Sequence, residues 1–148
     1  MKIYVSAPYS ADSSERILEN VKQAIDAGIK LWKKGHYPYI PHLSHWVAER
    51  AREIGVEMKY VEFLEWDRVW LEECDAVLYL GGSRGADFER SYAKLLGKRI
   101  FFDVDDVPEA DWLKHCRRFQ DVCLSCPFRG CCRTRMLEDL ESKVGEER

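Results

Sequence analysis

The sequence predicts an α/β fold in which helices cover both faces of a four- to five-stranded, mainly parallel sheet. Three observations predict it. Apolar, β-rich runs alternate with segments of helical period, a glycine-rich turn joins one such run to a helix, and 148 residues suffice for one domain with a sizeable core. Because crossovers between parallel strands are right-handed, helices are expected on both faces of the sheet. The prediction is a three-layer sandwich of the flavodoxin or Rossmann type.

The predicted strands are short apolar or aromatic runs bounded by turn residues. Pro38 and Pro41 place the second run at or near a sheet edge, because proline has no backbone N–H to donate to a neighbouring strand. The third run is apolar almost throughout, as a strand covered on both faces should be. In chain order, the strands are expected at residues 2–7, 36–42, 75–82 and 98–104.

The predicted helices have apolar residues at three- and four-residue spacing and recognisable end signals. The first begins at Ser13 or Ser14 and stops at Gly35, Ser44 is a plausible cap of the second, and Pro108 suits the first turn of the fifth. The helices after the first are expected at residues 44–55, 58–73, 86–96, 108–119 and 133–144.

Composition limits the kind of protein. The formal charge of −3 argues against a main role in neutralising nucleic-acid backbones. No apolar run approaches a membrane span and no signal peptide is recognisable, so we expect a cytoplasmic protein. We expect an α/β domain at residues 1–107 and a helical, cysteine-rich extension at residues 108–148, packed on the same domain.

Ligands of open parallel sheets bind beyond the carboxyl ends of the strands, near the point where strand order reverses. Two loops fit that place: SAPYS after the first strand and GGSRGAD after the third. Glu89, on the helix that follows the second loop, would face this crevice as a nucleophile or general base. The alternative is a first-turn carboxylate that the helix dipole favours.

Asp67 lies on a helix face otherwise built from large apolar residues, where a carboxylate is rare without a partner. The helix leads directly into the third strand and could bring Asp67 close to Glu89. Two neighbouring carboxylates push their pKa values apart, an arrangement used for chemistry at an anomeric carbon. The alternative is a surface ion pair of Asp67 with Arg68 or Arg52.

Three motifs resemble the nucleoside 2-deoxyribosyltransferase superfamily, which includes the 2′-deoxynucleoside 5′-phosphate N-hydrolases. They are IYVSAPYS, WD-x-x-WL-x-x-CDAVL and S-x-G-A-D-F-E-x-x-Y-A-x-x-LGK-x-I, over roughly residues 1–105, and GHYPYIPHLSHW is similar to uncharacterised phage and bacterial relatives. The resemblance implies that Glu89 attacks C1′ of the sugar, that Asp67 helps protonate the departing base and that Tyr4 is an active-site tyrosine. It also implies a homodimer or larger oligomer.

Ser83 lies six residues before Glu89, where by resemblance the transferases carry an aspartate and the monophosphate hydrolases a serine that contacts phosphate. A hydroxyl at a helix N-terminus welcomes a dianion, and Arg84 adds a cation. Asp87, two residues before Glu89, is expected to raise the pKa of Glu89. The expected substrate-binding residues of the two loops are Ser6, Pro8, Tyr9, Ser10, Gly82, Ser83, Arg84, Gly85 and Asp87.

The stretch PHLSHW is expected on the rim of the same crevice. His42 and His45 could hydrogen-bond a base or act as acid, and Trp46 could stack on it. The spacing of the two histidines also permits a metal pair, but no third ligand is in view, so the polar rim is preferred.

Five cysteines gather near the end of the chain: Cys116, Cys123, Cys126, Cys131 and Cys132. Four thiolates within twenty residues can hold a structural zinc ion or an iron–sulfur cluster, with zinc preferred. Free thiols, disulfides or a tail that only packs on the domain are the alternatives. No cofactor is expected to be needed for catalysis.

These features predict an N-glycosidase that acts on a (deoxy)nucleoside 5′-monophosphate through Glu89. A deoxyribosyltransferase would use the same residues with a second base in place of water. An alternative of another class is a nucleotide-binding or sensing module with a cysteine-bound metal, which would bind nucleotides without turnover.

Overall fold

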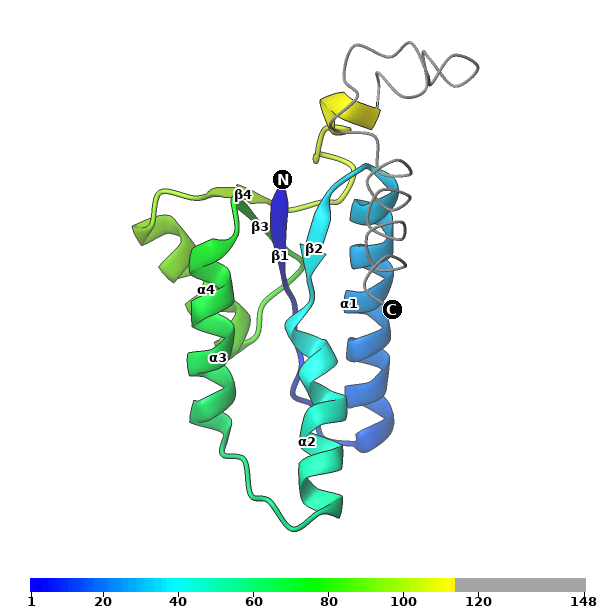
Figure 1. Cartoon of the computed structure of the whole chain (residues 1–148), viewed down its shortest axis with the longest axis vertical. Coiled ribbons are helices and arrows are strands. Elements are labelled where there is room, and N and C mark those ends of the chain that lie inside the picture. The colour runs from blue at the N-terminus through cyan, green and yellow to red at the C-terminus, as the bar shows by residue number, and fades with distance from the viewer. Residues whose placement is uncertain (114–148) are drawn as a thin grey trace, which may run out of the picture. The chain divides into compact units, whose positions relative to one another are not determined.

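A computed structural model describes residues 1–113 of the chain, and Met1–Pro108 form one compact unit. Its centre is a four-stranded parallel sheet with the order β2-β1-β3-β4 (Figure 1). The strands are β1 (Lys2–Ser6), β2 (Tyr37–Tyr39), β3 (Ala76–Tyr79) and β4 (Arg99–Phe101). The predicted parallel sheet is confirmed, and β2 lies at its edge, as the prolines indicated. Strand order reverses between β1 and β3.

Helices cover both faces of this sheet. α1 packs on one face and α3 and α4 on the other, which completes the three layers (Figure 1). The helices are α1 (Ser14–Lys33), the short 3-10 helix η1 (Pro41–Leu43), α2 (Ser44–Glu53), α3 (Tyr60–Glu73) and α4 (Arg84–Leu95). Within residues 1–113, none of them combines the length and the apolar composition that a membrane crossing requires.

The alternation of side chains along β1 separates the core from the candidate site. Ile3 and Val5 point into the apolar cluster under α1. Tyr4 packs on the opposite face with residues of α3 and α4, and Ser6 reaches α4 there by a hydrogen bond. The polar side chains of β1 therefore lie on the α3 and α4 face, because successive strand residues point to opposite sides.

Two of the helices that flank the sheet, α1 and α4, have a serine at the N-cap. The hydroxyl of Ser13 accepts from the backbone N–H of Arg16 at α1, and Gly35, at φ 86°, follows its end. The hydroxyl of Ser83 accepts from the N–H of Ala86, so α4 begins at Arg84 instead of the predicted residue 86. The serine cap satisfies a donor that the helix leaves unpaired, which brings the end of the glycine-rich loop into the first turn.

The segment after β2 differs from the prediction. Only three residues pair as a strand, because the chain turns into η1 at Pro41. Ser44 continues this turn with helical backbone angles and is the first residue of α2, so its expected role as a cap is wrong. Pro108 also departs from its predicted place, since the helical residues described after it begin only at 111. The rest of that helix, the last predicted helix and all five clustered cysteines lie outside the described residues.

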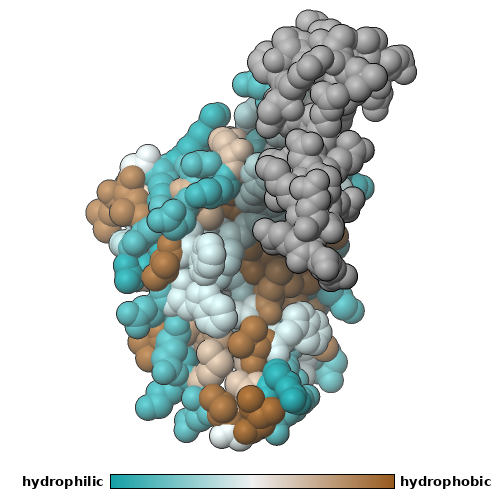
Figure 2. Space-filling model, in the orientation of Figure 1, coloured by the Kyte–Doolittle hydropathy of each residue, from teal (hydrophilic) through white to brown (hydrophobic). Residues whose placement is uncertain are grey.

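Large apolar side chains also reach the surface. On the face seen in Figure 2 they form brown patches between polar side chains. Among the large apolar and aromatic side chains that are exposed, α3 contributes Tyr60 and Val61 at its start and Val69 and Trp70 further along. α3 therefore has apolar residues on more than one side. The homodimer or larger oligomer stays a prediction.

Candidate active site

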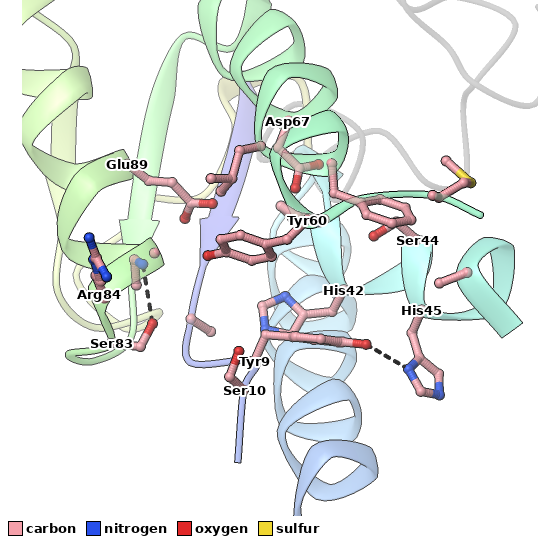
Figure 3. A pocket seen from close by; sticks show the side chains of 18 of the residues that line it. Tyr9, Ser10, His42, Ser44, His45, Tyr60, Asp67, Ser83, Arg84 and Glu89 are labelled. Atoms are coloured by element: carbon pink, nitrogen blue, oxygen red, sulfur yellow. Dashed lines mark hydrogen bonds between the residues drawn. The ribbon is translucent and has the colours of Figure 1, made fainter. Parts of the chain in front are cut away.

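A cavity of about 470 Å³ opens beyond the carboxyl ends of β1 and β3, where strand order reverses. The loop after β1, η1, α2, α3 and the first turns of α4 supply its walls (Figure 3). Glu89 and Asp67 both line it, although they come from different helices. This is the location that the sheet topology predicts for a ligand.

Glu89 is held by two hydroxyl groups of β1. The Tyr4 hydroxyl donates to Oε1 at 2.8 Å, and the Ser6 hydroxyl donates to Oε2 at 2.6 Å. Burial raises the pKa of Glu89 to about 7, the two hydrogen bonds oppose this shift, and the charge of Asp67 adds to it. A carboxyl group with these properties exchanges its proton near neutral pH.

Tyr4 and Ser6 are both fully buried and do not line the cavity. They lie behind Glu89 and contact its carboxylate. Ser6 was expected to bind substrate, but its hydroxyl is engaged by Glu89 and by the carbonyl oxygen of Ala86. The two β1 side chains therefore orient the carboxylate.

Asp67 projects from α3 into the same cavity (Figure 3). Its Oδ1 accepts a hydrogen bond of 3.3 Å from the Tyr39 hydroxyl, and burial raises the pKa of Asp67 to about 6. The alternative surface ion pair is wrong, since Arg68 pairs with Glu72 and Arg52 with Glu49. Asp67 is a carboxyl group that can carry a proton near neutral pH.

The first turn of α4 borders the cavity through Ser83, Arg84 and Gly85, whereas Gly82 does not line it. Asp87 points elsewhere. Its Oδ1 accepts a hydrogen bond of 2.6 Å from the Tyr79 hydroxyl and lies 3.3 Å from Arg90. The expected effect of Asp87 on Glu89 is absent, because the pKa of Glu89 is raised by burial and by Asp67.

The loop after β1 and the histidines form the opposite wall. Tyr9, Ser10, His42 and His45 line the cavity, and the Tyr9 hydroxyl contacts His45 Nδ1 at 2.9 Å (Figure 3). Pro8 does not line the cavity, contrary to expectation, and its carbonyl oxygen accepts from Nε2 of His42 at 3.0 Å.

His42 is buried, and burial lowers its pKa, so its ring is neutral near pH 7. Within the described part of the chain, no group of three metal-ligating side chains occurs.

Trp46 does not line the cavity, contrary to expectation. Its side chain is 54% exposed and contacts the ring of His45 edge-on. The apolar wall comes instead from α3, where Phe63 and Leu64 lie one turn before Asp67. Their spacing from Asp67 was visible in the sequence, since residues three and four apart share a helix face.

Other residues of the cavity wall could not be identified from the sequence. Tyr60, at the start of α3, reaches the first turn of α4, where a Cβ on Gly85 would lie 3.3 Å from its hydroxyl. Met58 and Arg52 join the wall from the α2–α3 connection and from α2. Their positions depend on how α2 folds over the end of the sheet.

Comparison with known proteins gives evidence about the fold. No protein-family model matches the chain, and no curated protein matches it. Among solved structures, a 2-deoxyribosyltransferase from the psychrotolerant bacterium Bacillus psychrosaccharolyticus is similar, with a TM-score of 0.50 and 18% sequence identity. The match covers 77% of this chain and 95% of that chain. The described chain therefore has the α/β fold of a nucleoside 2-deoxyribosyltransferase.

Proposed function

We propose that the protein is an N-glycosidase that cleaves the base–sugar bond of a (deoxy)nucleoside 5′-monophosphate. The observation that carries the proposal is a pair of carboxyl groups, Glu89 and Asp67, that share one cavity and have raised pKa values. Tyr4 and Ser6 orient the first of them. Carboxyl groups whose pKa values are raised by burial in a shared cavity are typical of catalytic sites.

In the first step, ionised Glu89 attacks C1′ and forms a glycosyl ester as the bond from C1′ to the base nitrogen breaks. The electron pair of that bond stays on the base, which takes a proton from Asp67. In the second step, water attacks C1′, its proton passes to Asp67 and the Glu89 carboxylate leaves. Both groups then return to their starting states, as in retaining glycosidases.

The first turn of α4 supports a phosphate-bearing substrate. Arg84 supplies a positive charge and the turn presents backbone N–H groups, both of which favour a dianion. Ser83 contributes a hydroxyl in place of a carboxylate, which would repel phosphate. Glu89 follows Arg84 by five residues, about 7.5 Å along the helix axis, which leaves room for a sugar between them.

A deoxyribosyltransferase is the second candidate, because the similar solved structure is one. The first chemical step would be the same, and a free base would replace water in the second. A third possibility, a nucleotide-binding module, would use the cavity without chemistry.

The test is chromatography of free bases after incubation with ribo- and deoxyribonucleoside monophosphates and with the matching nucleosides. We expect wild type to release base from at least one monophosphate and Glu89→Ala to release none. Glu65→Ala, which removes an exposed carboxylate of α3, is the matched control and should retain activity. Arg84→Ala should weaken the preference for nucleotides over nucleosides.

The outcomes separate the candidates. Base exchange with an added free base, in excess of hydrolysis, would establish the transferase. Nucleotide binding without release of base under either condition, and unchanged by Glu89→Gln, would refute both enzymatic candidates and favour the binding module.

A further inference from the structure

Two tyrosines on neighbouring strands hold the two carboxyl groups of the cavity. Tyr4 of β1 and Tyr39 of β2 are register partners in the parallel pair, and their ring centroids lie 5.6 Å apart. Tyr4 donates to Glu89 at 2.8 Å, and Tyr39 donates to Asp67 at 3.3 Å. The sheet thus supplies a tyrosine hydroxyl donor to each carboxyl group.

The ring of Tyr39 is fixed on both sides. It packs against the buried cluster that contains Tyr4, and its other neighbour is Trp70, stacked at 5.2 Å with an interplanar angle of 18°. Trp70 follows Asp67 by three residues on α3, so the same helix provides the carboxyl group and the clamp for its donor. This geometry leaves the Tyr39 hydroxyl little choice of position.

We propose that Tyr39 is a positioning residue for Asp67, which aims the carboxyl proton at the departing base. The hydrogen bond occupies Oδ1, so the proton of the neutral carboxyl group is expected on Oδ2. This inference rests on the proposed glycosidase function, since it assigns a role within that reaction. Tyr39 itself is expected to touch Asp67 and not the substrate.

The electrostatics of the neighbourhood agree with the geometry. Burial and the nearby carboxylates raise the pKa of Tyr39, so its hydroxyl remains a donor at neutral pH. Its hydrogen bond lowers the pKa of Asp67 against the larger effect of burial. The other titratable groups that interact with Asp67 are Glu89 on α4 and Tyr4 on β1.

Tyr39→Phe tests the inference, because it removes the hydroxyl and keeps the ring that stacks on Trp70. A hydrogen bond of ordinary strength corresponds to an upward shift of about half to one pH unit in the pKa of Asp67. Because Asp67 has the lower pKa of the pair, the acid limb of the pH profile of kcat/KM should move up by the same amount. We also expect kcat to fall about 10-fold with KM unchanged, a part of what a general acid contributes.

Asp67 can be observed without reference to activity by carbon-13 NMR of labelled aspartate carboxyl groups, assigned with Asp67→Asn. Tyr92→Phe is the matched control, since it removes a hydroxyl that bonds to Glu72 on the α3–α4 surface. Trp70→Leu is a second variant that keeps the hydroxyl and loosens its ring. It should shift the Asp67 titration in the same direction by less.

An upward shift in Tyr39→Phe, absent in Tyr92→Phe, together with the moved limb supports the inference. An unchanged Asp67 titration in Tyr39→Phe and Trp70→Leu overturns it, even in a fully active enzyme. If the Asp67 titration shifts but the wild-type protein releases no base from any substrate, the proposed glycosidase function is wrong, and the catalytic role of Tyr39 is overturned with it. The NMR and activity measurements therefore distinguish the two failures.

Discussion

The Tyr4→Phe substitution is the sharpest test of how the fold prepares Glu89. Tyr4 is fully buried, and its hydroxyl donates to Glu89 Oε1 at 2.8 Å. Phenylalanine keeps the ring and its packing and removes only this donor. Because the hydroxyl stabilises the ionised form, its loss raises the pKa of Glu89 further above its present value of about 7.

The size of the effect follows from two quantities. A hydrogen bond to a charged group contributes about 1.5–3 kcal/mol, which corresponds to about one to two pKa units. The reactive form has Glu89 ionised and Asp67 protonated, and with pKa values of about 7 and 6 its population peaks midway between them. That population is the product of the fraction of ionised Glu89 and the fraction of protonated Asp67. Raising the pKa of Glu89 by one unit therefore lowers the peak about 7-fold, and raising it by two units lowers the peak about 60-fold.

The assay is the pH dependence of kcat/KM for base release, because this parameter reports the groups of the free enzyme. Wild type should give a bell with its maximum between pH 6 and 7, set by the pKa values of Asp67 and Glu89. Tyr4→Phe should give a lower and broader bell, displaced by about half to one pH unit toward alkaline pH. A uniform loss at every pH, with both limbs in place, would refute the reasoning.

Three further predictions concern the charges and the scaffold. The pKa of Glu89 rises from 4.5 to about 7 on folding, so the stability it confers is complete below pH 4.5 and is lost as the pH rises through 7. Glu89→Gln should therefore raise the free energy of unfolding by up to about 3 kcal/mol at pH 8 and have little effect at pH 4, measured by urea denaturation at each pH. Asp67→Asn should lower kcat about 10²–10⁴-fold for ordinary bases and much less for substrates whose leaving group needs no proton. Lys34→Met should destabilise the fold by about 1–3 kcal/mol, because Nζ donates to the carbonyl oxygens of residues 104, 105 and 107, whereas the exposed neighbour Lys33→Met should not.

Much of the fold was predictable because its signals are local. The cap at Ser13, the glycine at the end of the first helix and the apolar third strand each depend on a few adjacent residues. The placement of Glu89 also followed from local order, since a glycine-rich turn after a central strand delivers the next helix to the crevice. α4 begins two residues before its predicted start, because the Ser83 hydroxyl caps it by accepting from the N–H of Ala86.

The partners of the carboxyl groups were not predictable in the same way. In the sequence, Tyr39 is one of several aromatic residues in an edge strand, and its contact with Asp67 joins β2 to α3. The short sequence separation of Asp87 and Glu89 predicts that Asp87 raises the pKa of Glu89. In the structure Asp87 binds Tyr79, since side chains two residues apart on a helix point in different directions.

The sequence by itself determined that the chain forms a parallel α/β sandwich, and it indicated which carboxyl group follows the central glycine-rich turn. Those properties depend on periodicity, caps and turns, which act within one element at a time. Only the tertiary structure decided that Tyr4, Ser6 and Tyr39 hold Glu89 and Asp67, and that Trp46 lies outside the cavity. Such contacts depend on strand register and helix packing, which bring together side chains that lie far apart in the chain.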